Sequence, residues 1–187
     1  MLIVFGGAFN PPTVAHLNII KKLLSTFKGS QVLILPVGDD YKKPELIPFH
    51  YRMDMLNLLI EGIDHVMVSS LEKDSGYMGT LASLKELKKS YEDVHFVMGS
   101  DQLSGLKSWI RHEELLESFP FIIMTRKDSL SEQDAEILFS NLKHRFTFVH
   151  FDQDMSSTKV RKNLKYSKKY LTEQVHQYII KNHLYEE

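Results

Sequence analysis

The sequence of 187 residues contains no cysteine, and this absence excludes several kinds of chemistry at once. Without cysteine there is no disulfide, no zinc site built from thiolates and no cysteine nucleophile. Nine glycines and six prolines are scattered along the chain, and no low-complexity run or internal repeat divides it. We therefore expect a single domain over residues 1–187, with residues 156–187 as a helical C-terminal extension.

The sequence also lacks an excess of charge and any long apolar run. The 23 Lys and Arg residues nearly balance the 24 Asp and Glu residues, so the overall charge does not point to a nucleic acid partner. No apolar segment approaches the roughly 18 residues of a membrane-spanning helix, and the N-terminus lacks the basic region of a signal peptide. The sequence predicts a cytoplasmic protein without nucleic acid or membrane partners, and it leaves the oligomeric state open.

Several common catalytic motifs are missing as well. The chain has no GxxxxGK[ST] phosphate-binding loop, no GxGxxG fingerprint, no HExxH zinc motif and no GxSxG nucleophile elbow. P-loop NTPases, zinc proteases of the HExxH type and serine hydrolases with that elbow are therefore excluded. We predict no metal site built from the chain's own side chains.

Short apolar runs alternate with segments in which apolar residues recur every three or four positions. The runs predict strands at 2–5, 31–37, 64–69, 94–98, 121–125 and 146–149. The periodic segments predict helices at 14–27, 48–61, 80–91, 103–116, 129–142, 157–164 and 172–183, with polar loops at 38–44 and 72–79. This alternation predicts an α/β fold with a parallel sheet, and ligands bind such sheets beyond the carboxyl ends of the strands.

The first strand ends at Gly6 and Gly7, and Thr13 and His16 follow at the start of a helix. The first N–H groups of a helix lack internal partners and carry partial positive charge, so a phosphate is a natural ligand there. A hydroxyl and an imidazole three residues apart share one face of that turn. The same residues also suit a helix N-cap and a structural histidine, so local pattern alone leaves both interpretations open.

Three later segments fall at the same edge of the predicted sheet. Lys42 and Lys43 form a basic loop, and Arg52 follows in the next helix; a solvated basic surface is the alternative. Gly99 and Asp101 end the fourth strand, where a carboxylate can hold sugar hydroxyls or serve as a helix N-cap.

The third of these segments combines hydroxyls with a guanidinium at a predicted helix start. Such a set suits a di- or triphosphate because the planar fork of arginine matches phosphate geometry. A solvated basic helix face is the alternative. The residues are Ser156, Ser157, Thr158 and Arg161.

These segments carry a resemblance to a known family. GGAFNPPTVAH resembles the (H/T)xGH signature of the nucleotidyltransferase superfamily, and MSSTKVR resembles its ISSTxIR partner motif. ILPV, RMDML, FVMGSDQLSGLKSW, FIIMTRKD and VHQYIIKNHLY extend the likeness over nearly the whole chain, and the chain is most similar to the bacterial nicotinate-nucleotide adenylyltransferases. That family makes deamido-NAD by moving AMP from ATP to the phosphate of nicotinate mononucleotide, releasing pyrophosphate, on a Rossmann-like doubly wound sheet with Mg²⁺.

The resemblance also implies roles for individual residues. His16, Thr13, Lys43 and Arg161 would neutralise phosphate charge as the catalytic residues. ATP would be bound by Gly6, Gly7, Phe9, Thr13, His16, Gly99, Asp101, Ser156, Ser157, Thr158 and Arg161. The mononucleotide acceptor would be bound by Tyr77, Thr80, Trp109 and Arg126, with Trp109 meeting the pyridine ring; taken alone, a tryptophan is more often core.

The chain departs from the family pattern at several positions. Thr13 replaces a histidine, Ala15 a glycine and Asn10 an aspartate, and Tyr41-Lys42 replaces Pro-His. The acceptor segment that normally reads ExxRxGxSYTxxTL is shorter here, EKDSGYMGTL, and lacks the arginine and the Tyr-Thr pair. Two alternatives follow: the same fold with a different phosphate acceptor, or a nucleotide-binding protein with weakened catalysis.

Overall fold

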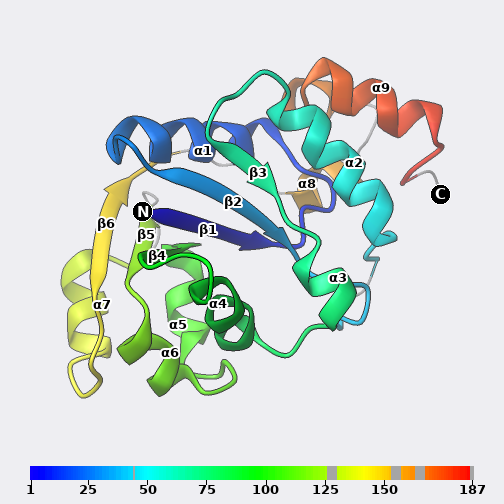
Figure 1. Ribbon diagram of the computed structural model, residues 1–187. Helices are drawn as coiled ribbons and strands as arrows, with labels where there is room; N and C mark the ends of the chain where they lie inside the picture. The colour runs from blue at the N-terminus through cyan, green and yellow to red at the C-terminus, as the bar shows by residue number, and fades with distance from the viewer. Residues whose placement is uncertain (44, 126–129, 153–156, 163–166, 186–187) are drawn as a thin grey trace.

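The computed structural model describes residues 1–43, 45–125, 130–152, 157–162 and 167–185, and a parallel sheet lies at its centre (Figure 1). In this part of the chain the strands lie in the order β3-β2-β1-β4-β5-β6, and each neighbouring pair is parallel. The strand order reverses between β1 and β4, which confirms the predicted α/β fold with a doubly wound sheet. The strands are β1 (Leu2–Gly7), β2 (Gln31–Pro36), β3 (Val66–Val68), β4 (Val94–Gly99), β5 (Phe121–Thr125) and β6 (Phe146–His150).

Helices cover both faces of the sheet (Figure 1). One face carries α1 (Val14–Thr26), α2 (Phe49–Ile60), α8 (Ser157–Lys162) and α9 (Glu173–Lys181). The other face carries α4 (Thr80–Lys88), α5 (Leu103–Leu106), α6 (His112–Ser118) and α7 (Glu132–Leu138). Shorter elements complete the description: α3 (Leu71–Ser75) and the 3-10 turns η1 (Ser100–Gln102) and η3 (Lys168–Tyr170).

The first strand shows why its sequence is an unbroken apolar run. Ile3 and Phe5 belong to the apolar cluster under α1 and α2, whereas Leu2 and Val4 belong to the cluster on the opposite face. All four side chains are buried. A strand that is covered on both faces has no polar side, so apolar and polar residues do not alternate along it.

Two sequence predictions were wrong in detail. The segment 72–79, predicted as loop, is partly helical because α3 runs from Leu71 to Ser75. The helix predicted over 103–116 is broken between α5 and α6, where Arg111 has a φ of 54°. The apolar spacing runs across this break because both short helices bury leucines in the same cluster. As a result Trp109 lies in the connection between helices.

The ends of some predicted strands and helices also differ from those in the structure. The strand predicted over 64–69 shortens to β3, and the helix predicted over 129–142 becomes α7, which begins after an N-cap at Ser131 and ends at Leu138. Ser131 Oγ accepts a 3.1 Å hydrogen bond from the backbone N–H of Asp134. Ser129, the first residue of the predicted helix, lies outside the described residues.

The last described helix returns to the carboxyl edge of the sheet. The hydroxyl of Tyr178 in α9 donates a 2.6 Å hydrogen bond to Asp54 Oδ2 in α2. Beyond α9 the hydroxyl of Tyr185 donates to Asn10 Oδ1 at 2.8 Å. The end of the chain is therefore tied to the loop that follows β1. Among the described helices, none combines the length and the apolar character that crossing a membrane requires.

Candidate active site

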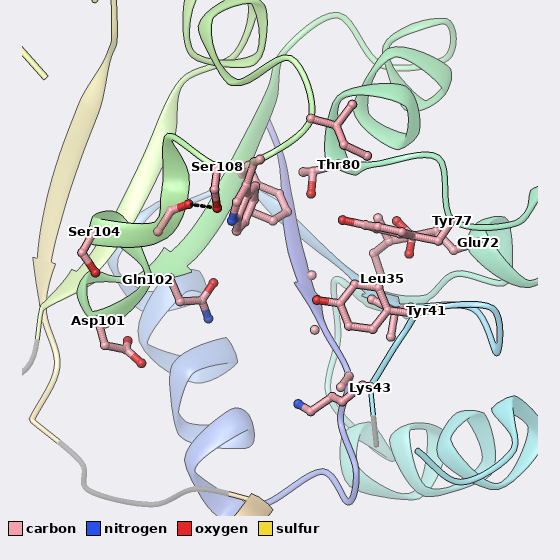
Figure 2. A pocket seen from close by; sticks show the side chains of 18 residues that line it. Leu35, Tyr41, Lys43, Glu72, Tyr77, Thr80, Asp101, Gln102, Ser104 and Ser108 are labelled. Carbon is pink, nitrogen blue, oxygen red and sulfur yellow. Dashed lines mark hydrogen bonds between the residues drawn. The ribbon is translucent and has the colours of Figure 1, made fainter. Parts of the chain in front are cut away.

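A cavity of about 670 Å³ opens at the carboxyl edge of the sheet, beside the point where the strand order reverses (Figure 2). Its wall begins with the backbone at the end of β1, and segments that follow β2, β3 and β4 contribute the rest. A ligand site was predicted at this edge, because parallel strands present their carboxyl ends together. Of the residues predicted to bind substrates, the wall includes Gly6, Gly7, Lys43, Tyr77, Thr80, Asp101 and Trp109.

Glycine is needed where β1 enters the cavity, because neighbouring rings approach its backbone. A Cβ atom on Gly6 would lie 2.9 Å from the ring of Phe96, and one on Gly7 would lie 3.1 Å from the ring of Phe9. Both distances are shorter than ordinary carbon contacts. Because the two glycines have no side chains, the backbone at the end of the strand borders the cavity directly.

Two groups of side chains face each other across the cavity (Figure 2). Tyr41, Glu72, Tyr77 and Thr80 lie on one side, and the segment from Asp101 to Ser108 lies on the other. Gly99 is not part of the wall, but a Cβ atom there would lie only 2.3 Å from Asp101 Oδ1. Gly99 thus makes room for the Asp101 carboxylate at the end of β4.

Aromatic rings line the first side of the cavity. The rings of Tyr41 and Tyr77 meet edge to face at 4.8 Å and 88°, and the backbone N–H of Tyr77 donates a 2.8 Å hydrogen bond to Asp40 Oδ2. Burial raises the pKa of the Tyr77 hydroxyl, which therefore stays protonated at neutral pH. These two contacts fix the position of Tyr77 in the short acceptor segment.

Trp109 is half-buried, with its ring packed edge-on against Phe96 at 6.1 Å and 78°. The same side chain lines the cavity. The core interpretation holds for the part of the ring that packs on Phe96, and contact of Trp109 with a pyridine ring stays a prediction.

Thr13 and His16 form a capping box at the start of α1. The backbone N–H of Thr13 donates to His16 Nδ1 at 2.9 Å, and Thr13 Oγ1 lies 2.9 Å from the same atom. Because Nδ1 accepts from an N–H group, the proton of the neutral ring sits on Nε2, which can donate to a phosphate oxygen. The ring of Phe9 packs against His16 at 5.1 Å and fixes it from the side.

The capping geometry bears out the structural interpretation of these two residues without removing the functional one. Thr13 is completely buried, and neither Thr13, His16 nor Phe9 lines the cavity. Thr13 therefore orients His16 in this structure. Direct phosphate contacts of these three residues stay predictions.

The second predicted phosphate motif lies against the first, although the two are far apart in sequence. Ser157 Oγ donates to the backbone oxygen of Pro11 at 2.7 Å, and Arg161 Nη1 donates to the backbone oxygen of Asn10 at 2.7 Å. Thr158 in the same helix is exposed. Ser156 and Arg126, which we predicted as ATP- and acceptor-binding residues, lie outside the described residues.

Lys43 connects this cluster to the cavity. Its side chain lines the cavity, and partial burial together with the nearby positive charge of Arg161 lowers the pKa of its ammonium group. Arg161 Nε also lies 3.2 Å from Glu45 Oε2. The rim thus gathers cations that an anionic ligand would neutralise.

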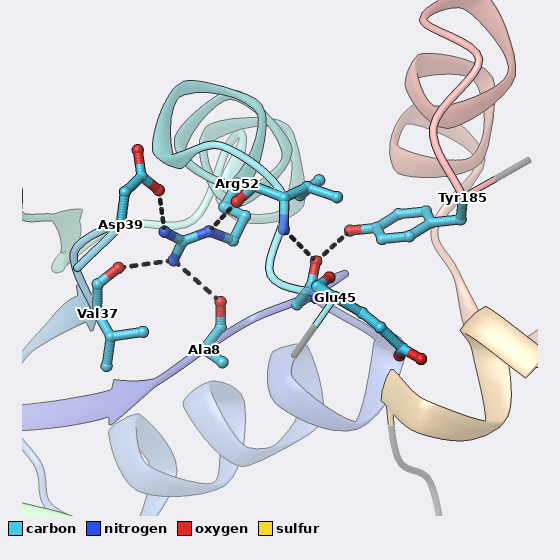
Figure 3. A network of polar contacts seen from close by, with 8 residues as sticks. Ala8, Val37, Asp39, Glu45, Arg52 and Tyr185 are labelled. Carbon is cyan, nitrogen blue, oxygen red and sulfur yellow. Dashed lines mark hydrogen bonds and ion pairs between the residues drawn. The ribbon is translucent and has the colours of Figure 1, made fainter. Parts of the chain in front are cut away.

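Arg52 is a residue whose place the sequence interpretation missed (Figure 3). Its side chain is fully buried, and the guanidinium donates to the backbone oxygens of Ile47 at 2.9 Å, Val37 at 2.8 Å and Ala8 at 3.2 Å. It also pairs with Asp39 Oδ1 at 3.0 Å. Arg52 ties together the loops that follow β1 and β2, and it is not the solvated surface cation that we considered.

The sequence held a signal for this burial. Arg52 falls three positions after Phe49 and four before Leu56, so it occupies the apolar stripe of α2. A cation in such a stripe is buried only when it is hydrogen-bonded, as Arg52 is. Glu72 is a second residue missed as a site candidate: it is buried, and it lines the cavity beside Tyr77.

Comparison with known proteins places the chain in a family. The model of the cytidylyltransferase-like family matches residues 4–163. The chain belongs to the cytidylyltransferase-like family. Within this family, a protein of Acholeplasma laidlawii named "Probable nicotinate-nucleotide adenylyltransferase" is 39% identical and covers 100% of this chain and 98% of its own. A Clostridium botulinum protein of the same name is 31% identical, with 97% of each chain covered.

Solved structures agree on the fold of this cytidylyltransferase-like chain. A Plasmodium falciparum nicotinic acid mononucleotide adenylyltransferase complexed with NaAD matches with a TM-score of 0.81, covering 98% of this chain and 96% of that chain at 24% identity. The same Plasmodium enzyme complexed with APC matches with a TM-score of 0.79. The likeness to these structures confirms the predicted Rossmann-like fold. The family match and the 39% identical relative show that the chain is a nucleotidyltransferase-family enzyme, as the motifs indicated.

Proposed function

We propose that this protein transfers AMP from ATP to the phosphate of nicotinate mononucleotide, releasing pyrophosphate and forming deamido-NAD. The observation that carries the proposal is the 2.7 Å hydrogen bond from Arg161 to Asn10, which holds the two phosphate motifs together beside the cavity. The relatives at 39% and 31% identity, which are named for this activity, support the choice of acceptor. ATP is a cytoplasmic substrate, so the same proposal places the reaction in the cytoplasm.

The reaction needs no covalent enzyme intermediate. A phosphate oxygen of nicotinate mononucleotide attacks the α-phosphorus of ATP, and the bond from that phosphorus to the bridging oxygen of pyrophosphate breaks. Pyrophosphate leaves with the electron pair. The enzyme therefore contributes by aligning two phosphates and by neutralising the charge that grows on the leaving group.

Each side chain of the two motifs, together with Lys43, suits one part of that task. His16 Nε2 is held as a hydrogen-bond donor because Nδ1 is engaged by Thr13, and it would contact the α- and β-phosphates. Arg161, with Ser156 and Thr158, would hold the β- and γ-phosphates. Lys43 adds a positive charge at the cavity wall next to Arg161.

The remaining predicted residues recognise the two nucleosides. Asp101 follows β4 at the edge where a carboxylate can accept hydrogen bonds from ribose hydroxyls. Trp109 and Tyr77 offer aromatic faces or edges to a pyridine ring, and Thr80 offers a hydroxyl beside them. Arg126 is proposed as a further acceptor contact from the family likeness alone.

Mg²⁺ fits this site as a companion of ATP. In the described part of the chain, no three His, Asp or Glu side chains come together as a metal site. We therefore propose that the triphosphate oxygens carry the ion. Bound Mg²⁺ would supply further positive charge to the leaving pyrophosphate.

One assay tests the proposal. Purified protein is incubated with ATP and Mg²⁺ and, separately, nicotinate mononucleotide, nicotinamide mononucleotide, phosphopantetheine or FMN, and pyrophosphate release is followed. We expect release with nicotinate mononucleotide. Release with a different acceptor alone would replace the proposed substrate, and ATP binding without any release would indicate a nucleotide-binding protein with weakened catalysis.

A further inference from the structure

The acceptor side of the cavity contains a buried carboxyl group whose role is not assigned. Glu72 in α3 is only 3% exposed, although it lines the cavity beside Tyr77 and Thr80 (Figure 2). Its Oε1 accepts a 2.7 Å hydrogen bond from Ser83 Oγ in α4. Its Oε2 is buried and has no hydrogen-bond partner among the described residues. Buried polar atoms are nearly always satisfied, so Oε2 calls for a partner that is not part of the chain.

The protonation state of Glu72 decides what that partner is. Burial raises the pKa of the carboxyl, the negative charge of Asp40 raises it further, and the hydrogen bond from Ser83 opposes both effects. Ser83 donates to Oε1, so Oε1 behaves as the carbonyl oxygen and Oε2 as the hydroxyl. When protonated, Glu72 carries an O–H donor on a side chain that lines the cavity.

We propose that Glu72 selects the acceptor by donating a hydrogen bond from Oε2 to the carboxylate oxygen on the pyridine ring of the bound mononucleotide. This inference rests on the proposed adenylyl transfer to a pyridine mononucleotide. Glu72 is a specificity-determining residue under this proposal, and the phosphates react at the other end of the site.

Charge explains the direction of the selection. A hydrogen bond from a neutral acid to a carboxylate is charge-assisted and stronger than one to the oxygen of an amide. The neutral acid therefore favours nicotinate over nicotinamide. An ionised Glu72 would do the opposite, because it would repel the nicotinate carboxylate and accept from the amide NH₂ group. The two states make opposite predictions about acceptor preference.

Three variants separate these possibilities by steady-state kinetics with both pyridine mononucleotides. Glu72→Leu removes the donor while keeping the volume, and Glu72→Gln replaces the acid O–H with an amide N–H and can still accept from Ser83. Glu86→Gln is the control, because Glu86 is an exposed carboxylate of α4 that pairs with Lys89.

We expect Glu72→Leu to raise KM for nicotinate mononucleotide about 10-fold to 100-fold, as loss of a hydrogen bond to a charged group does. Its KM for ATP should stay within about twofold, and its use of nicotinamide mononucleotide should fall less. Glu72→Gln should remain within about threefold of the wild type for nicotinate mononucleotide, and Glu86→Gln should be unchanged.

Each contrary outcome has a separate meaning. If the wild type is active and Glu72→Leu keeps its KM for nicotinate mononucleotide, the role of Glu72 is overturned while the proposed function stands. If Glu72→Leu impairs the use of nicotinamide mononucleotide more than the use of nicotinate mononucleotide, the role of Glu72 is also overturned, because that result requires an ionised Glu72. No release by the wild type with either acceptor would overturn the proposed function and this role together.

Infrared difference spectroscopy gives a readout that does not depend on whether the leucine variant folds. The wild-type protein should show a protonated carboxyl C=O band that is absent from Glu72→Gln. Adding nicotinate mononucleotide without ATP should shift this band to lower frequency, because its O–H becomes hydrogen-bonded. A band that is missing from the wild type, or one that does not respond to the mononucleotide, would contradict the proposal.

Discussion

The guanidinium of Arg161 donates a 2.7 Å hydrogen bond to the backbone oxygen of Asn10, across 151 positions of sequence. This bond ties α8 to the loop between β1 and α1. Ser157 makes a second tie, to Pro11 in the same loop. The two segments that resemble the phosphate motifs of nucleotidyltransferases therefore form one unit at the rim of the cavity.

Arg161 should be more sensitive to substitution than its neighbours in α8. Arg161→Gln should lower kcat/KM for ATP about 100-fold, because it removes a charge from the proposed triphosphate site. Arg161→Lys keeps the charge but cannot reproduce the planar fork, so a loss of about 10-fold is expected. Pyrophosphate release at varied ATP concentration measures both. The control is Lys162→Gln, an exposed cation of the same helix, and equal losses in Arg161→Gln and Lys162→Gln would argue against a specific role.

His16→Ala should lower turnover by about 100-fold or more, as losing one preorganised donor to a transition state typically does. His16 also contributes to the cap of α1, so thermal unfolding must be measured beside the rate. His50→Ala, at an exposed histidine of α2, provides the comparison and should leave turnover within about twofold. Near-normal turnover in a folded His16→Ala variant would remove His16 from the reaction.

Arg52→Met should destabilise the protein by about 3 kcal/mol, because several backbone oxygens lose their donor inside the protein. The carboxylate of Asp39 is 58% exposed and remains hydrated after the change. Asp39→Asn should therefore cost less than about 1 kcal/mol. Denaturant unfolding with both variants tests this order, and a larger effect for Asp39→Asn would show that the ion pair matters more than the backbone contacts.

Glu72 gives a prediction for the pH dependence of stability, since its folded-state pKa is raised above the ordinary value of 4.5. Below pH 4.5 the folded and unfolded chains both bind the proton, so this group adds no dependence. Above that value the unfolded chain loses the proton while the folded chain keeps it, and stability falls as pH rises until Glu72 ionises in the folded state too.

The matched comparison for this effect is Glu72→Gln, which does not titrate. The free energy of unfolding of the wild type, relative to Glu72→Gln, should decrease with rising pH above 4.5 by at most about 1.4 kcal/mol per pH unit. Denaturant unfolding between pH 4 and pH 8 measures it. A difference that grows with pH instead would mean that the folded state stabilises the ionised form.

The strands and most helices were predictable because they depend on local spacing. Leu2 to Phe5 form an apolar run that is typical of a strand buried on both faces, and the structure places it at the centre of the sheet. The break at Arg111 was not predictable, because the leucines on either side of it maintain one apolar pattern while the backbone turns.

The residue types of the candidate site could also be predicted from the sequence, through the motifs around His16 and Arg161 and the family resemblance of those motifs. The sequence did not predict which neighbouring groups each side chain contacts. Arg52 was considered a solvated cation because its partners are backbone oxygens in the two separate loops that follow β1 and β2, and no sequence pattern identifies such partners. Glu72 was passed over for the same reason, since Ser83 and the cavity wall reach it only after α3 and α4 pack together.

The sequence by itself determined the α/β alternation, the edge of the sheet where the cavity opens, and the nucleotidyltransferase family, because each follows from residues close together or from short motifs. Only the tertiary structure decided that Arg161 lies against Asn10, that Arg52 is buried, and that Oε2 of Glu72 has no hydrogen-bond partner among the described residues. The physical reason is that hydrogen-bond satisfaction and burial depend on segments brought together by folding, and their separation along the chain conceals them.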